Sequence, residues 1–318
     1  MAQEAREISG SVERKVEEIY GDVVGGRVPV RNPRLAARVL EEEYKLVVDE
    51  RIVALIFAAF TNQRPVLIEG PPGTGKTEIG EALLELWSGK RPFVLPCSEN
   101  YDEYKVIGDF HPVMAMKRGF NEESFIPRPL LAAMILDTGV LIDEIRRSSE
   151  DFQNMLLDVA DKRRIIVPEL KRVFRARGSG FQIVFTSNPE DIGQNDLSDA
   201  FLRRVIRVRF DYPPRRVEEK IVRLRALEEP VITPVAMNLI LETVKRLRST
   251  GIVHKPGSSE SVMWARMAQT VARLRGSREV TIGDLASVAP SVLVKRVEDA
   301  EIVERVLYEV LGVEADRR

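Results

Sequence analysis

The sequence predicts an α/β domain with a doubly wound parallel sheet, followed by an all-α domain. First, a short apolar run at 66–68 leads into a glycine loop at 70–75 and then into a run with helical spacing at 79–87. Second, short apolar segments alternate with helical stretches as far as residue 212, which is typical of parallel strands covered by helices on both faces. Third, only helical patterns follow the prolines at 213 and 214.

The composition is that of a globular protein with a charged surface. The 318 residues are 44% hydrophobic and 31% charged, and 48 Lys and Arg against 49 Asp and Glu leave a formal net charge of -1. This balance provides no overall field for nucleic acid or an anionic membrane, although it leaves room for local basic clusters. The single cysteine, Cys97, excludes an internal disulfide, and its place at the end of an apolar run favours a packed thiol.

The chain shows no targeting or membrane signal. Its N-terminus lacks the basic-then-apolar order of a secretion signal. The longest apolar run, at 52–60, is too short to span a bilayer. We therefore expect a cytoplasmic protein. Because this run is apolar around nearly its whole circumference, it predicts a helix buried behind the glycine loop.

The first 48 residues predict an N-terminal helical segment. Apolar residues have helical spacing between 12 and 20, glycines at 21, 25 and 26 then break the pattern, and a second helical pattern covers 35–44. We expect the first of these helices to be detached from the core.

Further strands are expected between residues 94 and 210. The segments at 140–142 and 183–185 are continuously apolar, as in strands inside a sheet, whereas the segment at 206–210 alternates with arginines and suits an edge. With a strand at 94–95 and the run at 66–68, they predict an α/β core over residues 49–214. A helical domain is predicted over 215–318, with helices near 215–228, 234–248, 258–275, 281–289 and 295–311.

Residues 70–77 have the composition of a phosphate-binding loop. Backbone N–H groups can turn inward around a triphosphate only where residues tolerate positive φ, and Gly73 and Gly75 supply that freedom. A helix beginning near Lys76 points its N–H groups and positive dipole end at the phosphates of ATP, and Thr77 is expected to bind Mg²⁺. The predicted nucleotide-binding residues are Gly70, Pro71, Pro72, Gly73, Thr74, Gly75, Lys76, Thr77 and Glu78.

Two adjacent carboxylates, Asp143 and Glu144, follow the buried strand at 140–142. In a parallel sheet the carboxyl ends of the strands share one crevice with the phosphate loop. We therefore expect Asp143 to hold the metal together with Thr77, and Glu144 to polarise the attacking water as general base.

The strand at 183–185 leads to Asn188, and its amide is a candidate to hydrogen-bond both the γ-phosphate and the attacking water. An asparagine that begins a turn before proline is the alternative interpretation.

Two adjacent arginines, Arg203 and Arg204, precede the last strand. A guanidinium near the γ-phosphate can neutralise charge in the transition state, and in ring-forming ATPases it comes from the neighbouring subunit. The alternative is a solvated pair.

The order of these motifs resembles that of the AAA+ ATPases, and the closer match is to the MoxR group of the clade with a helix-2 insert. The match covers roughly residues 45 to 270. The residues that carry it are Ser98-Glu99-Asn100-Tyr101-Asp102, Ile107-Gly108-Asp109, Arg128-Pro129-Leu130-Leu131-Ala132-Ala133-Met134, Leu141-Ile142-Asp143-Glu144-Ile145 and Thr186-Ser187-Asn188-Pro189.

The resemblance implies a P-loop NTPase core with strand order 5-1-4-3-2 and a C-terminal lid. It also implies a hexameric ring with ATP between subunits. An insert near 109–128 and a hairpin near 163–180 would face the pore side of the ring. Arg204 aligns with the arginine that such proteins insert into a neighbouring site, and Arg203 is the second candidate.

One departure from the family concerns a second arginine that contacts the phosphates from the start of a lid helix. The comparable stretch here, residues 257–261, contains no arginine. Arg266 could replace it only if the helix is rotated or extended, so this role stays unassigned.

Residues 161–177 form a basic stretch. The stretch contains seven basic and two acidic residues, which predicts either a solvated hairpin or a site for an acidic partner or nucleic acid.

The function predicted first is ATP hydrolysis in a ring that remodels, matures or activates a partner enzyme complex together with a von Willebrand factor A domain protein, as the resemblance implies. An ATP-driven nucleic-acid motor is the alternative, since such motors share the insert. A nucleotide-dependent scaffold with little turnover is a third interpretation.

Overall fold

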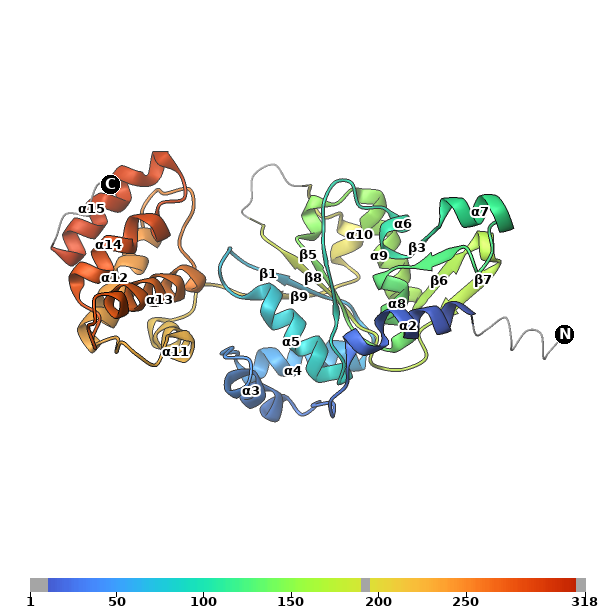
Figure 1. Cartoon of the computed structure of the whole chain (residues 1–318), viewed down its shortest axis with the longest axis horizontal. Coiled ribbons are helices and arrows are strands. Elements are labelled where there is room, and N and C mark those ends of the chain that lie inside the picture. Colours follow the sequence, from blue (N-terminus) through green and yellow to red (C-terminus); the bar gives the residue numbers. More distant parts are fainter. Residues whose placement is uncertain (1–10, 190–194, 313–318) are drawn as a thin grey trace. The chain divides into compact units, whose positions relative to one another are not determined.

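The computed structural model describes residues 11–189 and 195–312, and its contacts divide the chain into two compact units (Figure 1). Of the described residues, one unit comprises 11–44, 48–70, 76–189 and 195–209, and the other comprises 45–47, 71–75 and 210–312.

The first unit is built on a parallel sheet of five strands. These are β1 (Val66–Glu69), β2 (Phe93–Pro96), β5 (Val140–Asp143), β8 (Ile183–Ser187) and β9 (Ile206–Arg209). The order across the sheet is β2-β5-β8-β1-β9, and all four pairings are parallel. Read from the β9 edge and numbered along the chain, this is the predicted order 5-1-4-3-2. The predicted fold class is therefore confirmed, and the alternating strand β9 lies at an edge.

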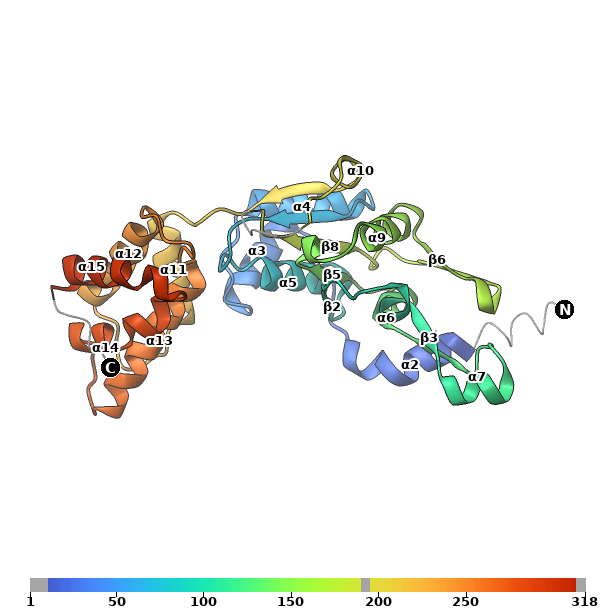
Figure 2. The ribbon, with the colours of Figure 1, turned by 90° about the horizontal axis from the view of Figure 1, so that it is seen from above.

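Helices flank this sheet (Figures 1 and 2). They are α3 (Pro33–Glu42), α4 (Glu50–Thr61), α5 (Lys76–Ser88), α8 (Pro129–Leu136), α9 (Glu150–Lys162) and α10 (Asp199–Leu202). The run at 52–60 was predicted as a buried helix; it is a helix, but only one side of it is buried, because Leu55 in α4 is 47% exposed while Val53 and Ile56 are buried. A helix that covers one face of a sheet needs only one apolar stripe.

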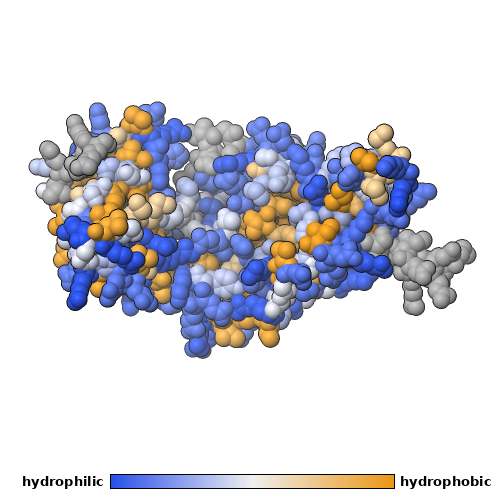
Figure 3. Space-filling view, in the orientation of Figure 1, coloured by the Kyte–Doolittle hydropathy of each residue, from blue (hydrophilic) through white to orange (hydrophobic). Residues whose placement is uncertain are grey.

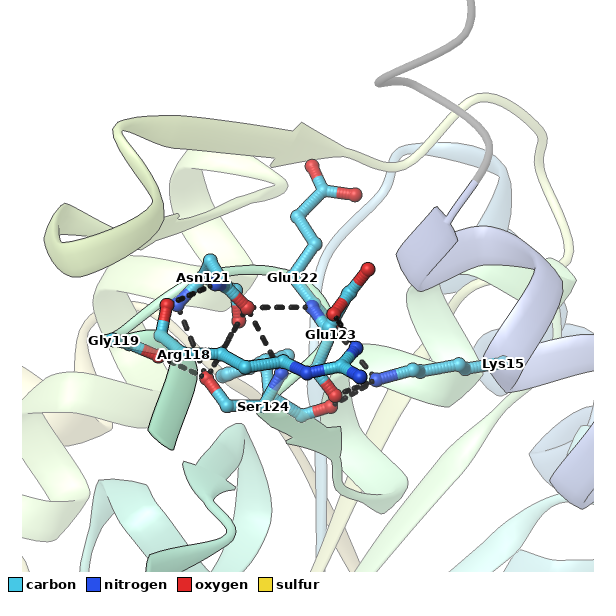
Figure 4. A network of polar contacts seen from close by, with 8 residues as sticks. Lys15, Arg118, Gly119, Asn121, Glu122, Glu123 and Ser124 are labelled. Carbon is cyan, nitrogen blue, oxygen red and sulfur yellow. Dashed lines mark hydrogen bonds and ion pairs between the residues drawn. The ribbon is translucent and has the colours of Figure 1, made fainter. Parts of the chain in front are cut away.

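The N-terminal helix α2 (Ser11–Val24) is not detached as predicted, but packs on α8 and β4 (Phe125–Pro127). Val12 and Val16 are fully buried. Near its start, the ammonium of Lys15 donates hydrogen bonds to the main-chain oxygens of Glu122, Glu123 and Phe125 at 2.8, 2.6 and 3.0 Å (Figure 4). The helical spacing of α2 indicated an apolar face, but no local pattern indicated what covers it.

Two small antiparallel elements extend from the sheet. The first is β3 (Gly108–Phe110) paired with β4, with the short α6 (Glu103–Val106) before it and α7 (Pro112–Arg118) between the two strands. The second is the hairpin of β6 (Arg164–Val167) and β7 (Arg172–Arg175). These elements occupy the stretches where an insert and a hairpin were expected.

Apolar side chains are exposed at the α7 end of this unit (Figure 3). Met116 is 88% exposed and Phe120 is 66% exposed. Phe110 packs inside the insert, with its ring centre 5.1 Å from that of Phe120 and 5.2 Å from that of Phe125.

Helices are the regular elements of the second unit in its described part, apart from one isolated bridge between Val231 and Glu279. Its core surrounds Trp264, which is fully buried. Its helices are α11 (Arg215–Arg225), α12 (Pro234–Arg248), α13 (Ser258–Leu274), α14 (Ile282–Leu293) and α15 (Ala300–Leu311). Glu218 of α11 forms a buried ion pair with Arg248 of α12 and accepts a hydrogen bond from the Ser261 hydroxyl.

Candidate nucleotide-binding site

The glycine loop between β1 and α5 has the backbone conformation that its sequence predicts. Gly73 has φ +70° and Gly75 has φ +82°, in the left-handed region that only glycine adopts without strain. Helix α5 begins at Lys76, so its first-turn N–H groups have no acceptor within the helix. At the start of the loop, the Gly70 N–H donates to the Ser187 carbonyl at 3.3 Å, which ties the loop to the end of β8.

The two predicted metal ligands lie in contact. The Thr77 hydroxyl donates to a carboxylate oxygen of Asp143 at 2.8 Å, and the Thr186 hydroxyl donates to the same oxygen. Hydroxyl and carboxylate oxygens suit Mg²⁺. No group of three or more His, Cys, Asp and Glu side chains in the described residues could hold a metal. The donors fit a Mg²⁺ ion that keeps water and takes phosphate oxygens, which is the usual coordination of this ion.

Glu144 lies directly after Asp143 in a left-handed conformation, with φ 55° and ψ 51°. Its backbone N–H donates to the Thr186 hydroxyl at 2.9 Å. Its carboxylate pairs with the Arg147 guanidinium at 2.9 Å, and both side chains are about half exposed. Thr186 thus connects the two acidic residues to β8, a contribution that sequence reasoning missed.

Asn188 follows β8 and is buried, with 7% of its surface exposed. Ser187 lies opposite Glu69 in the pairing of β8 with β1, and Glu69 directly precedes the glycine loop. The structure therefore brings Asn188 to the same edge of the sheet as Lys76 and Asp143.

The two candidate arginines do not join this cluster within one chain. Arg203 and Arg204 are exposed and precede the amino end of β9, whereas the other site residues lie at or beyond the carboxyl ends of the parallel strands. The Arg204 guanidinium instead pairs with Asp161 of α9 at 3.0 Å.

A buried acidic residue, Glu69, was not predicted as part of the site. It is 5% exposed, and one of its carboxylate oxygens accepts a hydrogen bond from Arg207 at 2.8 Å. A second arginine, Arg146, lies 3.9 Å from its other oxygen. A charged residue at the end of a buried strand was the available signal, because such groups are seldom buried without a partner.

Cys97 is a packed thiol beside this edge, as its sequence context predicted. Its N–H donates to the main-chain oxygen of Asp143 at 2.9 Å. Burial raises the pKa of the Cys97 thiol to about 12, and the negative charge of Asp143 adds to this effect. The thiol therefore stays protonated at neutral pH.

The basic stretch at 161–177 is not one continuous patch. Three of its seven basic side chains have partners inside the unit: Arg163 donates to two main-chain oxygens, Arg172 pairs with two carboxylates and Lys162 pairs with Asp158. Lys162 is exposed despite its pair, and Lys171, Arg175 and Arg177 are exposed as well. The charge available to a partner is therefore smaller than the sequence suggested.

Comparisons with known proteins agree with this geometry. Residues 65–205 match the AAA domain of the dynein-related subfamily. Protein CbbQ of Hydrogenophilus thermoluteolus is 28% identical over 184 residues, which are 57% of this chain and 65% of CbbQ. The uncharacterized protein YehL of Escherichia coli (strain K12) is 28% identical over 163 residues, 50% of this chain and 45% of YehL. Over these residues the chain is similar to MoxR-like AAA+ ATPases.

The chain spans 65% of the length of CbbQ and 45% of the length of YehL. Among solved structures, an ATPase candidate from Cytophaga hutchinsonii ATCC 33406 is 16% identical, with 99% of each chain covered and a TM-score of 0.39. With so low a TM-score, that match supports no conclusion of its own. In the part of the chain that the structure describes, no helix has the length and apolar character needed to cross a membrane.

Proposed function

We propose that this chain binds ATP with Mg²⁺ and hydrolyses it. The contact between Thr77 and Asp143 at the start of α5 carries this proposal, because it joins the loop and the acidic strand end in one place. Lys76 binds the β- and γ-phosphates, and Thr77 and Asp143 hold the metal. Bound Mg²⁺ supplies positive charge that neutralises the phosphates.

In the proposed chemistry, two side chains act on the attacking water. Glu144 takes up its proton as general base, and Asn188 orients it against the γ-phosphate. Because the Glu144 carboxylate pairs with Arg147, it must turn away from that guanidinium to reach the water.

We propose further that the active unit is a ring, with six subunits as in the family that the chain resembles. The opposite placement of Arg204 and Asp143 along the sheet supports this, since an arginine at the amino end of β9 cannot stabilise γ-phosphate charge at the carboxyl end in its own chain. Arg204, or Arg203 beside it, would act on the site of the next copy.

The proposed role of the ring is to remodel, mature or activate a partner enzyme complex in the cytoplasm, together with a von Willebrand factor A domain protein. This part rests on the resemblance to the MoxR group. Mass spectrometry of proteins that co-purify with the Glu144→Gln variant in the presence of ATP would identify the partner. A binding partner without such a domain would contradict this role.

Three substitutions test the chemistry. Lys76→Ala is expected to abolish binding of a fluorescent ATP analogue. Glu144→Gln should bind ATP and stop turnover, and Arg204→Ala should retain binding while turnover falls by about a thousandfold. EDTA should remove the activity of the wild-type protein, and excess Mg²⁺ should restore it. Full activity of the Glu144→Gln protein would overturn the assignment of the base.

A nucleic-acid motor is the alternative function, and the exposed side chains of Lys171, Arg175 and Arg177 on the β6–β7 hairpin favour it. If the chain is such a motor, its affinity for DNA should fall steeply as the salt concentration rises, and DNA should stimulate its ATPase activity. The pairing of Arg172 with two mostly buried carboxylates counts against this alternative, because this cation is already neutralised.

A further inference from the structure

Arg146 lies against three separate segments of the first unit at once. It lies in the single helical turn η1 (Ile145–Arg147) directly after Glu144, and its side chain is 15% exposed. Its Nε donates to the Ser187 hydroxyl at 2.8 Å, and one terminal nitrogen donates to Asp196 at 3.1 Å. The other terminal nitrogen lies 3.9 Å from Glu69.

Each partner belongs to a segment with its own role. Glu69 ends β1 before the glycine loop, and Ser187 directly precedes Asn188. Asp196 lies at the start of the segment that runs through α10 to Arg203 and Arg204. The main chain makes the same connection, because the Asn195 N–H donates to the Arg146 carbonyl at 3.0 Å.

Neutralising Glu69 does not account for these contacts. Arg207 already pairs with Glu69 at 2.7 Å, and the Glu69 oxygen nearest Arg146 accepts no hydrogen bond. Arg146 instead uses two of its N–H groups on Ser187 and on the fully exposed carboxylate of Asp196. An exposed ion pair of this kind is weak, so it can break and form again.

We propose that Arg146 is a positioning residue that couples the γ-phosphate end of β8 to the segment carrying Arg203 and Arg204. A guanidinium is planar with its donors in a fixed fork, so it holds Ser187 and Asp196 in one relative position. When the end of β8 adjusts to a bound γ-phosphate, Asp196 must follow or lose its partner. Arg146 thereby places the arginine of its own subunit for use by the next one.

A cavity of about 340 Å³ lies beside Arg146, so its side chain is not tightly packed on that side. Asn100, Arg147 and Asn195 are among the residues that line it. Asn195 is anchored on its inner side, where its amide donates to the Ser148 carbonyl at 2.9 Å.

The inference rests on the proposed ATPase function and is tested with mixed rings. Arg146→Ala should lower kcat by about tenfold or more while the KM for ATP changes by less than about twofold. Arg146→Lys keeps the charge but not the fork, and should resemble the alanine variant. Arg38→Ala, which removes an exposed arginine of α3, is the matched control and should behave as wild type.

Mixing separates an effect on the neighbouring site from an effect on the subunit's own site. Arg146→Ala subunits keep Lys76, Asp143 and Glu144 but have a misplaced arginine, whereas Glu144→Gln subunits have an inactive site and a well-placed arginine. Combined before ATP is added, they should hydrolyse ATP several-fold faster than the sum of the separate proteins. A mixture no faster than that sum would overturn the inference.

A second mixture of variants shows whether a negative result comes from the proposed ring itself. Arg204→Ala mixed with Glu144→Gln should also recover turnover, and if it does not, the ring proposal fails rather than the role of Arg146. Should Arg146→Ala not fold, as judged by circular dichroism, Asp196→Asn decides, since its carboxylate is fully exposed. It should lower kcat with unchanged KM and recover in the same mixture, and wild-type kinetics would overturn the inference.

Discussion

Each unit of the molecule buries an arginine beside a glutamate, but the two arginines are held very differently. In the helical unit, Arg248 is 13% exposed and donates to both carboxylate oxygens of Glu218 at 2.7 Å. It also donates to the Pro256 carbonyl at 2.7 Å and lies 4.3 Å from the ring centre of Tyr212. In the α/β unit, Arg146 is 15% exposed, yet its contact with Glu69 is 3.9 Å long.

The difference shows that burial alone does not tell what an arginine does. Arg248 meets one carboxylate with two parallel hydrogen bonds, the strongest arrangement for a guanidinium, and this joins α11 to α12. Arg146 divides its donors among separate segments and holds none of them in this paired manner. The first arrangement suits a fixed core, and the second suits a part that changes partners.

Arg248→Ala should cause the largest loss of stability. It leaves the buried Glu218 carboxylate without its cation, and breaking such a pair costs about 3–5 kcal/mol of unfolding free energy. Urea denaturation followed by circular dichroism would measure the loss. Arg246→Ala in the same helix removes only exposed ion pairs and serves as control. Equal losses in the two variants would show that the buried pair of Arg248 with Glu218 contributes no more than the exposed pairs of Arg246.

Arg172→Ala should have an intermediate effect. Arg172 pairs with Glu13 of α2 at 2.8 Å and with Glu122 of the insert at 2.9 Å, and all three side chains are mostly buried. We expect a loss of about 2 kcal/mol. Proteolysis should then cut near α2 faster than in wild type, because the substitution removes one tie between α2 and the hairpin. Unchanged proteolysis would show that Val12, Val16 and Lys15 hold α2 without Arg172.

The buried thiol of Cys97 should make a smaller contribution to stability, and this contribution depends on pH. The pKa of this thiol is about 12 in the folded chain, whereas its ordinary value is 9.0. Between pH 9 and pH 12 the unfolded chain therefore binds fewer protons than the folded chain. Stability should therefore fall as pH rises from 9 towards 12, by about 1 kcal/mol at pH 10, with no contribution below pH 9.

Denaturation of wild type and Cys97→Ala at pH 8 and pH 10 would isolate this effect from other titrating groups. The variant should lose less stability than wild type between the two values. If both proteins lose the same amount, the thiol is not protected by burial.

Asp196→Asn should have the smallest effect on stability. The carboxylate is fully exposed, so its pair with Arg146 is screened by solvent, and we expect no measurable change in the denaturation midpoint. A clear shift in that midpoint would mean that the Arg146 contacts are structural, as those of Arg248 are.

Local chemistry made the nucleotide site predictable from the sequence. Gly73 and Gly75 have the positive φ that their loop requires, and Asp143 ends a strand of continuously apolar residues. These features depend on residues that are neighbours along the chain. The strand order required the family resemblance as well, because periodicity shows that a strand forms but not which strand lies beside it.

The sequence by itself determined the glycine loop, the acidic strand end, the five strands and the helical second unit, because backbone conformation and apolar spacing are local properties. Only the tertiary structure decided the partners of the charged side chains. It placed Arg172 against Glu13, 159 residues away, and it turned Arg163 onto main-chain oxygens of its own unit. It also brought Arg146 to Ser187 and Asp196. The physical reason is that a charged group pairs with a group that lies near it in space, and for residues far apart along the chain that distance is set only when the elements have packed.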